Sequence, residues 1–201
     1  MTEDLYQAYT RKGESGKPLV FTFHGTGGNE NQFVPLVDGL IPGAQIVSPR
    51  GDVSEYGALR FFRRTGEGVY DMDDLARRTD KMTRFIASHK AANPGRDVYA
   101  LGYSNGANIL ASVLFRKPEL FDRVALLHPL IPWRPDDNAG LSGRKILVTG
   151  GERDPICPPA LSAALIDYFK AQNADVQSAM HGGGHEIRPD EISAITRFLN
   201  G

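Results

Sequence analysis

The chain has 201 residues, 41% of them hydrophobic, and its 23 basic and 24 acidic side chains leave a net charge of −1. This length supports a single domain over residues 1–201 with a substantial buried core. A near-neutral chain offers no large field to collect nucleic acid or an anionic membrane, so we expect a small-molecule substrate and no nucleic-acid partner. Cys157 is the only cysteine, and the sequence shows neither an export leader nor an apolar run of about 20 residues, which favours a cytoplasmic location without a membrane span.

Short runs of β-branched and large apolar residues alternate along the chain with longer segments of helical period. The runs predict strands at residues 5–10, 19–23, 45–48, 98–103, 124–127, 146–149 and 176–180. The longer segments predict helices at residues 31–39, 71–92, 105–115, 159–171 and 189–199. Several strands are apolar at every position, so the pattern predicts a three-layer α/β/α sandwich around a mostly parallel sheet. Residues 50–68 show neither period, and we expect a long ordered loop there, near the functional edge of the sheet.

A G-x-S-x-G pentapeptide, Gly102 to Gly106, lies between an apolar strand and an apolar helix. A chain that passes from strand to helix within two residues holds the turn residue, Ser104, in a strained conformation with its side chain aimed away from the sheet. The flanking glycines lack the Cβ atoms that would collide there. The pattern alone is weak, but its context on both sides predicts that Ser104 is a nucleophile.

The acid that supports Ser104 should lie in a loop that follows a strand, because ligands bind beyond the carboxyl ends of a parallel sheet. Asp154 and Asp52 both follow predicted strands, whereas Asp175 precedes one. The chain order Ser, Asp, His of this architecture favours Asp154 and leaves Asp52 as the alternative.

A serine hydroxyl is nearly inert at neutral pH and needs an imidazole that accepts its proton. His185 follows three glycines after the last predicted strand, so its loop can fold back toward the sheet, and we expect it to be the base. His181 is the competing base but is nearer the strand, where we expect it to be buried and hydrogen-bonded. His89 is expected on a helix surface. His128 ends a strand and could line the pocket, although packing is its more common role.

An oxyanion forms during acyl transfer and needs two fixed donors. The glycine-rich turn at residues 24–28 can aim the Thr26 amide toward the same point as the Asn105 amide, with His24 bracing the turn. A phosphate cradle is the alternative, but neither G-x-G-x-x-G nor G-x-x-x-x-G-K-[ST] occurs. His181 and His185 have the i, i+4 spacing of a zinc motif, yet the glycines between them disfavour a helix, and H-E-x-x-H is absent, so we expect neither metal nor cofactor.

Four segments, at residues 23–28, 102–106, 151–158 and 183–186, together resemble the carboxylesterase/phospholipase family of α/β-hydrolases, to which the acyl-protein thioesterases are related. The resemblance covers nearly the whole chain and implies an α/β-hydrolase fold without a separate cap domain. It also implies roles for five residues: Ser104 as nucleophile, Asp154 as orienting acid, His185 as base, and Thr26 and Asn105 as oxyanion donors. Residues 50–51 and 61–64 resemble a bacterial subset of the family. Many members have Gln at the position of Asn105, a difference that leaves the backbone donor intact.

The sequence says least about the substrate. Five apolar residues in predicted loops could wall an acyl or aromatic pocket, although packing is their more common role: Phe61, Phe62, Ile131, Trp133 and Ile156. Three arginines, Arg60, Arg63 and Arg64, could meet a substrate carboxylate, but a solvated basic loop is the favoured interpretation. The short chain suggests an open, shallow pocket for modest acyl groups.

These features predict a serine hydrolase that cleaves small to medium carboxylic esters through an acyl-enzyme. The alternatives are hydrolysis of acyl thioesters or lysophospholipids, and lactone opening of the dienelactone type, which more typically uses a cysteine nucleophile. A non-catalytic binder of small molecules could share the fold, but it would not need an acid and a base behind the serine. The terminal helix or an edge strand could also pair two copies into a homodimer.

Overall fold

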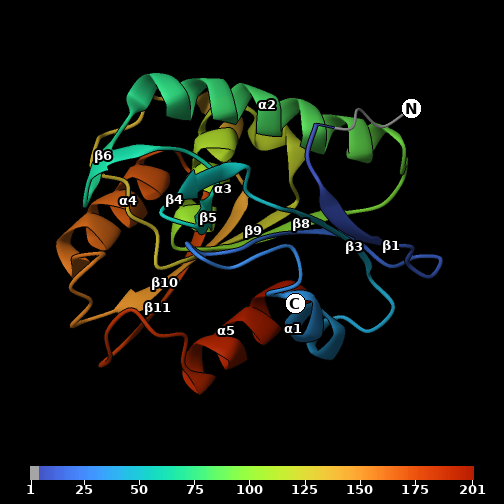
Figure 1. The fold of residues 1–201 in the computed structure, drawn as a ribbon. Coiled ribbons are helices and arrows are strands. Elements are labelled where there is room, and N and C mark those ends of the chain that lie inside the picture. Colours follow the sequence, from blue (N-terminus) through green and yellow to red (C-terminus); the bar gives the residue numbers. More distant parts are fainter. Residues whose placement is uncertain (1–4) are drawn as a thin grey trace.

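The computed structural model describes residues 5–201, and within them seven strands form one sheet (Figure 1). From one edge to the other the strands are β1 (Ala8–Arg11), β3 (Gln45–Pro49), β2 (Leu19–Phe23), β8 (Val98–Tyr103), β9 (Arg123–Leu127), β10 (Lys145–Gly151) and β11 (Asp175–His181). Only the β1–β3 pair in this sheet is antiparallel. The carboxyl ends of the six parallel strands therefore meet at one edge, where ligands bind in open α/β sheets.

Helices cover both faces of this sheet (Figure 1). One face carries α2 (Met72–Ala91), α3 (Asn105–Arg116) and α4 (Pro159–Ala171), and the other carries α1 (Val34–Leu40) and α5 (Pro189–Asn200). Two 3₁₀ turns, η1 (Pro118–Leu120) and η2 (Ala139–Leu141), lie between these elements. The predicted three-layer α/β/α sandwich with a mostly parallel sheet is confirmed.

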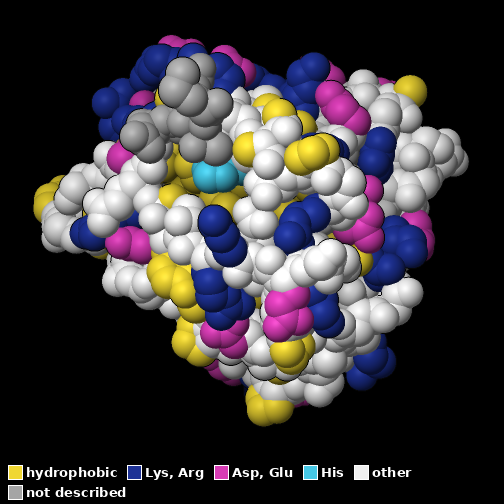
Figure 2. Space-filling model, turned by 90° about the vertical axis from the view of Figure 1, so that its right-hand side faces the viewer, with side chains coloured by type: hydrophobic (Ala, Val, Ile, Leu, Met, Phe, Trp, Pro, Cys, Tyr) yellow, Lys and Arg dark blue, Asp and Glu magenta, His cyan; other side chains and the backbone are white. Residues whose placement is uncertain are grey.

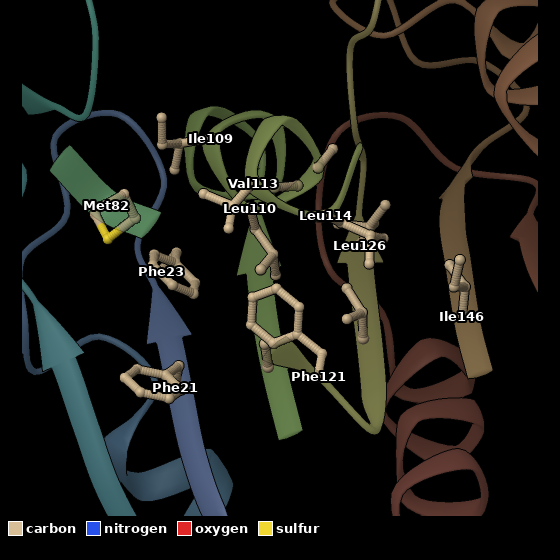
Figure 3. Packing of buried hydrophobic residues seen from close by; sticks show 14 of the residues in the cluster. Phe21, Phe23, Met82, Ile109, Leu110, Val113, Leu114, Phe121, Leu126 and Ile146 are labelled. Carbon is tan, nitrogen blue, oxygen red and sulfur yellow. The ribbon is translucent and has the colours of Figure 1, made fainter. Parts of the chain in front are cut away.

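Two apolar layers hold the helices to the sheet. In Figure 3, Phe21 and Phe23 of β2, Leu126 of β9 and Ile146 of β10 lie on the face of the sheet that α3 covers, and residues 105–114 of α3 are all buried. The opposite layer joins α1 and α5 to the other face of the same strands. Because α3 is buried over almost its whole length, its N-terminus, which carries the nucleophile candidate, is fixed against the sheet.

Residues 50–68, predicted as a loop, contain short strands, so that prediction is wrong in its secondary structure. The strands β4 (Val53–Glu55) and β5 (Ala58–Arg60) form one antiparallel hairpin, and β6 (Arg64–Gly66) and β7 (Val69–Tyr70) form another. The turn of the first hairpin holds Tyr56 and Gly57 at φ 51° and 88°, as a two-residue type I′ turn requires. Strands of two or three residues are too short to show a period in the sequence.

The boundaries of the predicted elements agree best where the signals are strongest. The strands β2 and β8 and the helix α4 have the predicted limits. The first predicted strand starts three residues early, because β1 begins at Ala8, and α1 begins at Val34 rather than at residue 31, after a series of turns. The helix α2 starts where the Asp71 carboxylate accepts a hydrogen bond from the Asp74 amide at 2.9 Å, which is an N-cap.

The surface shows no segregation of charge on the face drawn in Figure 2, where basic and acidic side chains alternate. None of the helices within residues 5–201 has both the length and the apolar character needed to cross a membrane.

Candidate active site

Ser104 occupies the junction of β8 and α3 with φ 52° and ψ −118°, a conformation that costs a non-glycine residue free energy. The junction is too tight for side chains on either flank. A Cβ on Gly102 would lie 2.6 Å from the Gly106 carbonyl oxygen, and a Cβ on Gly106 would lie 2.2 Å from that of Phe23. The two glycines are thus required by the sharp turn that presents the Ser104 hydroxyl above the sheet edge.

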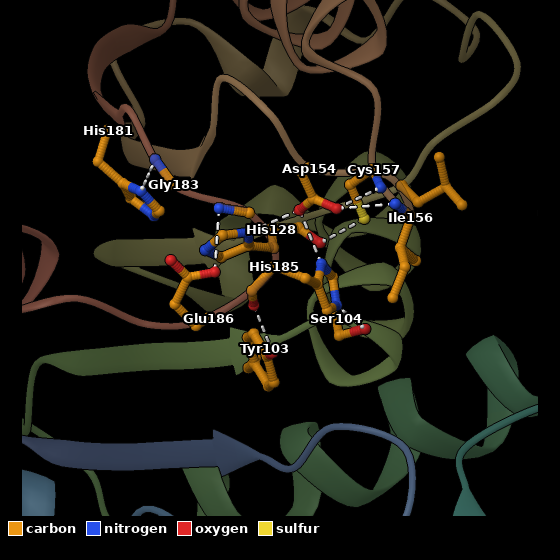
Figure 4. A network of polar contacts seen from close by, with 12 residues as sticks. Tyr103, Ser104, His128, Asp154, Ile156, Cys157, His181, Gly183, His185 and Glu186 are labelled. Carbon is orange, nitrogen blue, oxygen red and sulfur yellow. Dashed lines mark hydrogen bonds and ion pairs between the residues drawn. The ribbon is translucent and has the colours of Figure 1, made fainter.

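The structure brings Ser104, His185 and Asp154 together at this edge (Figure 4). The Ser104 Oγ atom lies 2.9 Å from His185 Nε2, and His185 Nδ1 lies 2.7 Å from Asp154 Oδ2. Since the carboxylate accepts, the His185 proton is on Nδ1, and Nε2 is free to accept the serine proton. The arrangement can therefore activate a hydroxyl.

The loop that carries His185 lies directly on the end of β10. A Cβ on Gly151 would be 2.0 Å from the Gly184 carbonyl oxygen, so the close approach requires glycine. Tyr103 donates its hydroxyl to the His185 carbonyl at 2.6 Å and has its ring 5.3 Å from the imidazole. The His185 side chain remains 17% exposed, so its outer nitrogen is accessible to a substrate.

Asp154 is buried and fully hydrogen-bonded. Its Oδ1 atom accepts from the amides of Ile156 and Cys157 at 2.8 and 2.9 Å. Burial opposes the charged form, but the hydrogen bonds from the Cys157 amide, His128 and His185 outweigh it and hold the Asp154 pKa below its usual value. The competing acids lie elsewhere: Asp52 pairs with Arg78 and Lys81, and Asp175 begins β11 at the opposite edge.

Two backbone amides near Ser104 are available as oxyanion donors. Among the described residues, neither the Thr26 amide nor the Asn105 amide donates a hydrogen bond within the protein, whereas the Ser104 amide donates to Leu127. His24 braces the first of these loops, as expected, because its Nε2 accepts from the Gly51 amide at 2.9 Å while Nδ1 contacts the Gly25 carbonyl. Burial lowers the His24 pKa, which favours the neutral ring that this bonding needs.

Side chains hold both donor positions. The Asn105 Oδ1 atom accepts from the buried Phe61 amide at 2.7 Å. The Arg60 Nη1 atom donates to the Thr26 hydroxyl at 2.8 Å, and its Nε donates to the Phe62 carbonyl. Arg60 is only 4% exposed, so the interpretation of residues 60–64 as a solvated basic loop is wrong for this residue. Residues 60–62, at the end of the β4–β5 hairpin, thus fix the backbone at Thr26 and Asn105.

A pocket of about 290 Å³ opens over Ser104 and His185. Its other walls come from the hairpin region and from the ends of neighbouring elements: Arg60, Arg64, Glu67, Tyr70, Asn108, Leu130 and Ile156. Ile156, which is 37% exposed, is the only one of the five predicted pocket residues found there.

The other predicted pocket residues have different positions. Phe61 and Phe62 are 0% exposed and belong to the core. Ile131 and Trp133 line a separate apolar cavity of about 590 Å³ against α4. Residues 61 and 62 were misassigned because they lie between the short strands β5 and β6, which direct both side chains into the core. Strands this short leave no period in the sequence.

Residues 61–186 match the model of the dienelactone hydrolase family. This match covers more than half of the chain. The protein belongs to the dienelactone hydrolase family. The expected α/β-hydrolase superfamily is thereby confirmed, with Ser104 at the position where the motif places the nucleophile.

Three relatives are similar over nearly their full lengths. The solved structure of Atu2452 from Agrobacterium tumefaciens, a protein of unknown function, is 53% identical, covers 100% of this chain and 98% of its own, and has a TM-score of 0.92. A Bacillus cereus carboxylesterase is 35% identical with a TM-score of 0.92, covering 98% of this chain and 95% of its own. MhqD of Bacillus subtilis (strain 168), which is named as a hydrolase, is 38% identical over 183 residues, 90% of each chain.

Sequence reasoning missed a second set of buried polar residues in this hydrolase. His128, assigned to packing, donates from Nδ1 to Asp154 Oδ2 at 2.8 Å, the same oxygen that His185 uses. Its Nε2 atom lies 3.2 Å from Glu191 Oε1, and His181 Nε2 lies 2.9 Å from Glu191 Oε2. The available signal was the position of His128 at a strand's carboxyl end, beside the acid.

These side chains also have the spacing of a metal site, but their protonation disfavours one. His128, His181 and Glu191 form one group of close ligand atoms, and His128, Asp154 and His185 form another. The Gly183 amide donates to His181 Nδ1 at 3.0 Å, so the neutral ring carries its proton on Nε2, the atom that a cation would need. In the second group the Nδ1 protons of both rings occupy the carboxylate. Hydrogen bonds therefore occupy both ring nitrogens of His128 and of His185 and the Nδ1 atom of His181.

Proposed function

We propose that this hydrolase is a serine carboxylesterase that cleaves small to medium carboxylic esters through an acyl-enzyme. The observation that carries the proposal is the continuous contact from Ser104 Oγ to His185 Nε2, at 2.9 Å, and from His185 Nδ1 to Asp154 Oδ2, at 2.7 Å. A structurally similar protein of Bacillus cereus is a carboxylesterase, which supports the ester as substrate class.

The first half of the reaction follows from this geometry. Ser104 Oγ attacks the ester carbonyl carbon while its proton passes to His185 Nε2, and the buried Asp154 carboxylate stabilises the imidazolium that results. The carbonyl oxygen becomes an oxyanion facing the Thr26 and Asn105 amides, each such donor being worth roughly 10²–10³ in rate. The C–O bond to the alcohol then breaks, and the alcohol leaves with the proton from His185.

Water completes the cycle by the same steps. His185 removes a proton from water, the hydroxide attacks the acyl carbon, and Ser104 leaves with the proton restored. The pocket of about 290 Å³ is smaller than most sites for drug-sized ligands, in keeping with modest acyl groups.

Cys157 is unsuited to replace Ser104 as the nucleophile. The residue is buried, and its thiol contacts the His128 carbonyl at 3.1 Å. Burial raises its pKa, which keeps the thiol protonated and unreactive.

Labelling with a fluorophosphonate, followed by mapping of the adduct, tests the nucleophile. We expect modification of Ser104 in the folded protein and hydrolysis of p-nitrophenyl esters that declines with increasing chain length. Ser104→Ala should lose turnover by on the order of 10⁶-fold, whereas Ser88→Ala on α2, whose hydroxyl bonds only the Phe85 carbonyl, should not. Wild-type turnover by Ser104→Ala would refute the proposal, and acyl thioesters run in parallel distinguish a thioesterase.

A further inference from the structure

His128 lies between two buried carboxylates. Its Nδ1 atom is 2.8 Å from Asp154 Oδ2, and its Nε2 atom is 3.2 and 3.3 Å from the two oxygens of Glu191. The side chain is 0% exposed, so water does not supply alternative partners. An ionised carboxylate only accepts hydrogen bonds. Both ring nitrogens of His128 must therefore be donors, which only the imidazolium provides.

The neighbours of His128 support this charge. Glu191 is held by the Arg188 amide, which donates to its Oε2 at 2.9 Å, and His181 Nε2 lies 2.9 Å from the same oxygen. His181 is neutral, because its Nδ1 accepts from the Gly183 amide. The buried cluster thus holds two carboxylates and one imidazolium, and its net charge is minus one. That charge pairs with His185 when His185 takes the proton from Ser104.

The backbone of His128 is also held in a costly conformation. Its φ is 49°, in the left-handed region, and its amide donates to the Thr149 carbonyl at 3.0 Å. Strain of this kind persists where surrounding contacts fix a functional geometry.

We propose that His128 is a positioning residue, a buried imidazolium that fixes Asp154 and weakens the hold of His185 on its proton. The proposal rests on the proposed function, since His185 is the base of that reaction. The two histidines share Asp154 Oδ2, and their ring centroids are 5.1 Å apart. A fixed positive charge at that distance disfavours a second one, so the proton that His185 takes from Ser104 passes readily to the leaving alcohol.

The groups that face His128 come from every element around it. They are Tyr103 at the end of β8, Asp154 and Cys157 after β10, His181 at the end of β11, His185 in the following loop and Glu191 on α5. Burial raises the pKa of Tyr103 to about 12 and also raises that of the Cys157 thiol, so neither carries charge near neutrality. Burial opposes a charge on His128, but the bonds to Glu191 and Asp154 outweigh it and raise its pKa.

Nitrogen-15 spectra of the histidine rings test the charge without any turnover. We expect both ring nitrogens of His128 to show the shifts of protonated nitrogen in the wild-type protein at neutral pH. The signals of the His128 ring are assigned as those that disappear in the spectrum of His128→Asn. A bare nitrogen on His128 would overturn the proposal. Absence of ester hydrolysis would instead contradict the proposed function and leave these spectra interpretable.

Substitutions at position 128 distinguish the effect of the hydrogen bond to Asp154 from that of the positive charge on the ring. Asparagine at position 128 tolerates the left-handed backbone and can still donate to Asp154, but it carries no charge. We expect the acidic limb of the kcat/KM profile for p-nitrophenyl butyrate to move up by about 1 pH unit in His128→Asn, with a loss of less than about tenfold on the plateau. His128→Gln also removes the charge but is strained at this φ of 49°, so it should lose more on the plateau.

The matched control is His89→Gln. His89 is a half-buried histidine of α2 that packs against Phe85 and Phe21, away from the site. Its variant should leave the acidic limb in place. An unshifted limb in folded His128→Asn would refute the effect of the charge on His185, whatever the spectra show.

Discussion

Gly106 in the first turn of α3 lies directly against the backbone of Phe23 at the end of β2: a Cβ on Gly106 would be 2.2 Å from the Phe23 carbonyl oxygen and 2.5 Å from that of His24. The neighbouring atoms belong to the backbone of a buried strand and cannot rotate away. The contact therefore sets the distance between the nucleophile's helix and the loop that carries Thr26.

Gly106→Ala should destabilise the protein because the helix must move off β2. We expect a loss of roughly 1–3 kcal/mol in the free energy of unfolding, the usual cost of overpacking, measured by urea denaturation. The control is Gly39→Ala in α1, where a Cβ would meet no atom within 4 Å, and where alanine should gain about 0.5–1 kcal/mol. Equal stability of Gly106→Ala and wild type would contradict this account of the junction.

The Arg60–Thr26 hydrogen bond should matter in the transition state rather than in substrate binding. Removing it with Arg60→Met or Thr26→Val frees the loop whose amide is the proposed oxyanion donor, and a small misplacement there should lower kcat by roughly tenfold with little change in KM. The double variant should lose no more than Arg60→Met alone, since the bond that Thr26→Val removes is already absent there. Arg63→Met is the control, because Arg63 is 56% exposed and pairs with Asp71. Additive losses would show that the two side chains act separately.

The sequence alone was sufficient to predict the site residues that follow the carboxyl ends of strands. Ser104, Asp154 and His185 were predicted because parallel strands bring their carboxyl ends to one edge, and the structure places all three there. The glycine pattern around Ser104 was equally informative, since steric need for glycine is local.

The rest depended on contacts between distant segments. Arg60 is buried because the three-residue strand β5 turns it toward Thr26, and no period in the sequence reveals so short a strand. His128 was assigned to packing because its partners, Asp154 and Glu191, are 26 and 63 residues away. Burial of a charged network is a property of the assembled fold, and single-sequence patterns do not record it.

Ile156 should control which acyl groups enter the pocket over Ser104. The residue lines that pocket and is partly exposed, so Ile156→Trp should narrow it. We expect kcat/KM for medium-chain p-nitrophenyl esters to fall by about 10-fold or more, while acetate is less affected. Leu161→Ala, in the separate cavity beside α4, should leave this preference unchanged. The reverse pattern would assign acyl binding to the cavity lined by Ile131 and Trp133.

The buried cluster also predicts how stability varies with pH. The pKa of His128 is raised above its ordinary value of 6.5, so its contribution is fully present below pH 6.5 and is lost as the pH rises through the folded-state value. The pKa values of Asp154 and Glu191 are lowered from 3.8 and 4.5, so their contributions are present above those values and are lost as the pH falls through the folded-state ones. The cluster therefore stabilises the fold most between about pH 4.5 and 6.5.

Urea denaturation of wild type and His128→Asn isolates this contribution, because other titrating groups cancel in the difference. At about pH 5.5 we expect the variant to be less stable by on the order of 3 kcal/mol, the cost of removing one partner from a buried ion pair. The difference should shrink as the pH rises above 6.5 and through the raised folded-state pKa of His128, since the wild-type imidazolium then loses its proton. A difference that stays constant or grows with pH would mean that the His128 ring is neutral in the folded protein.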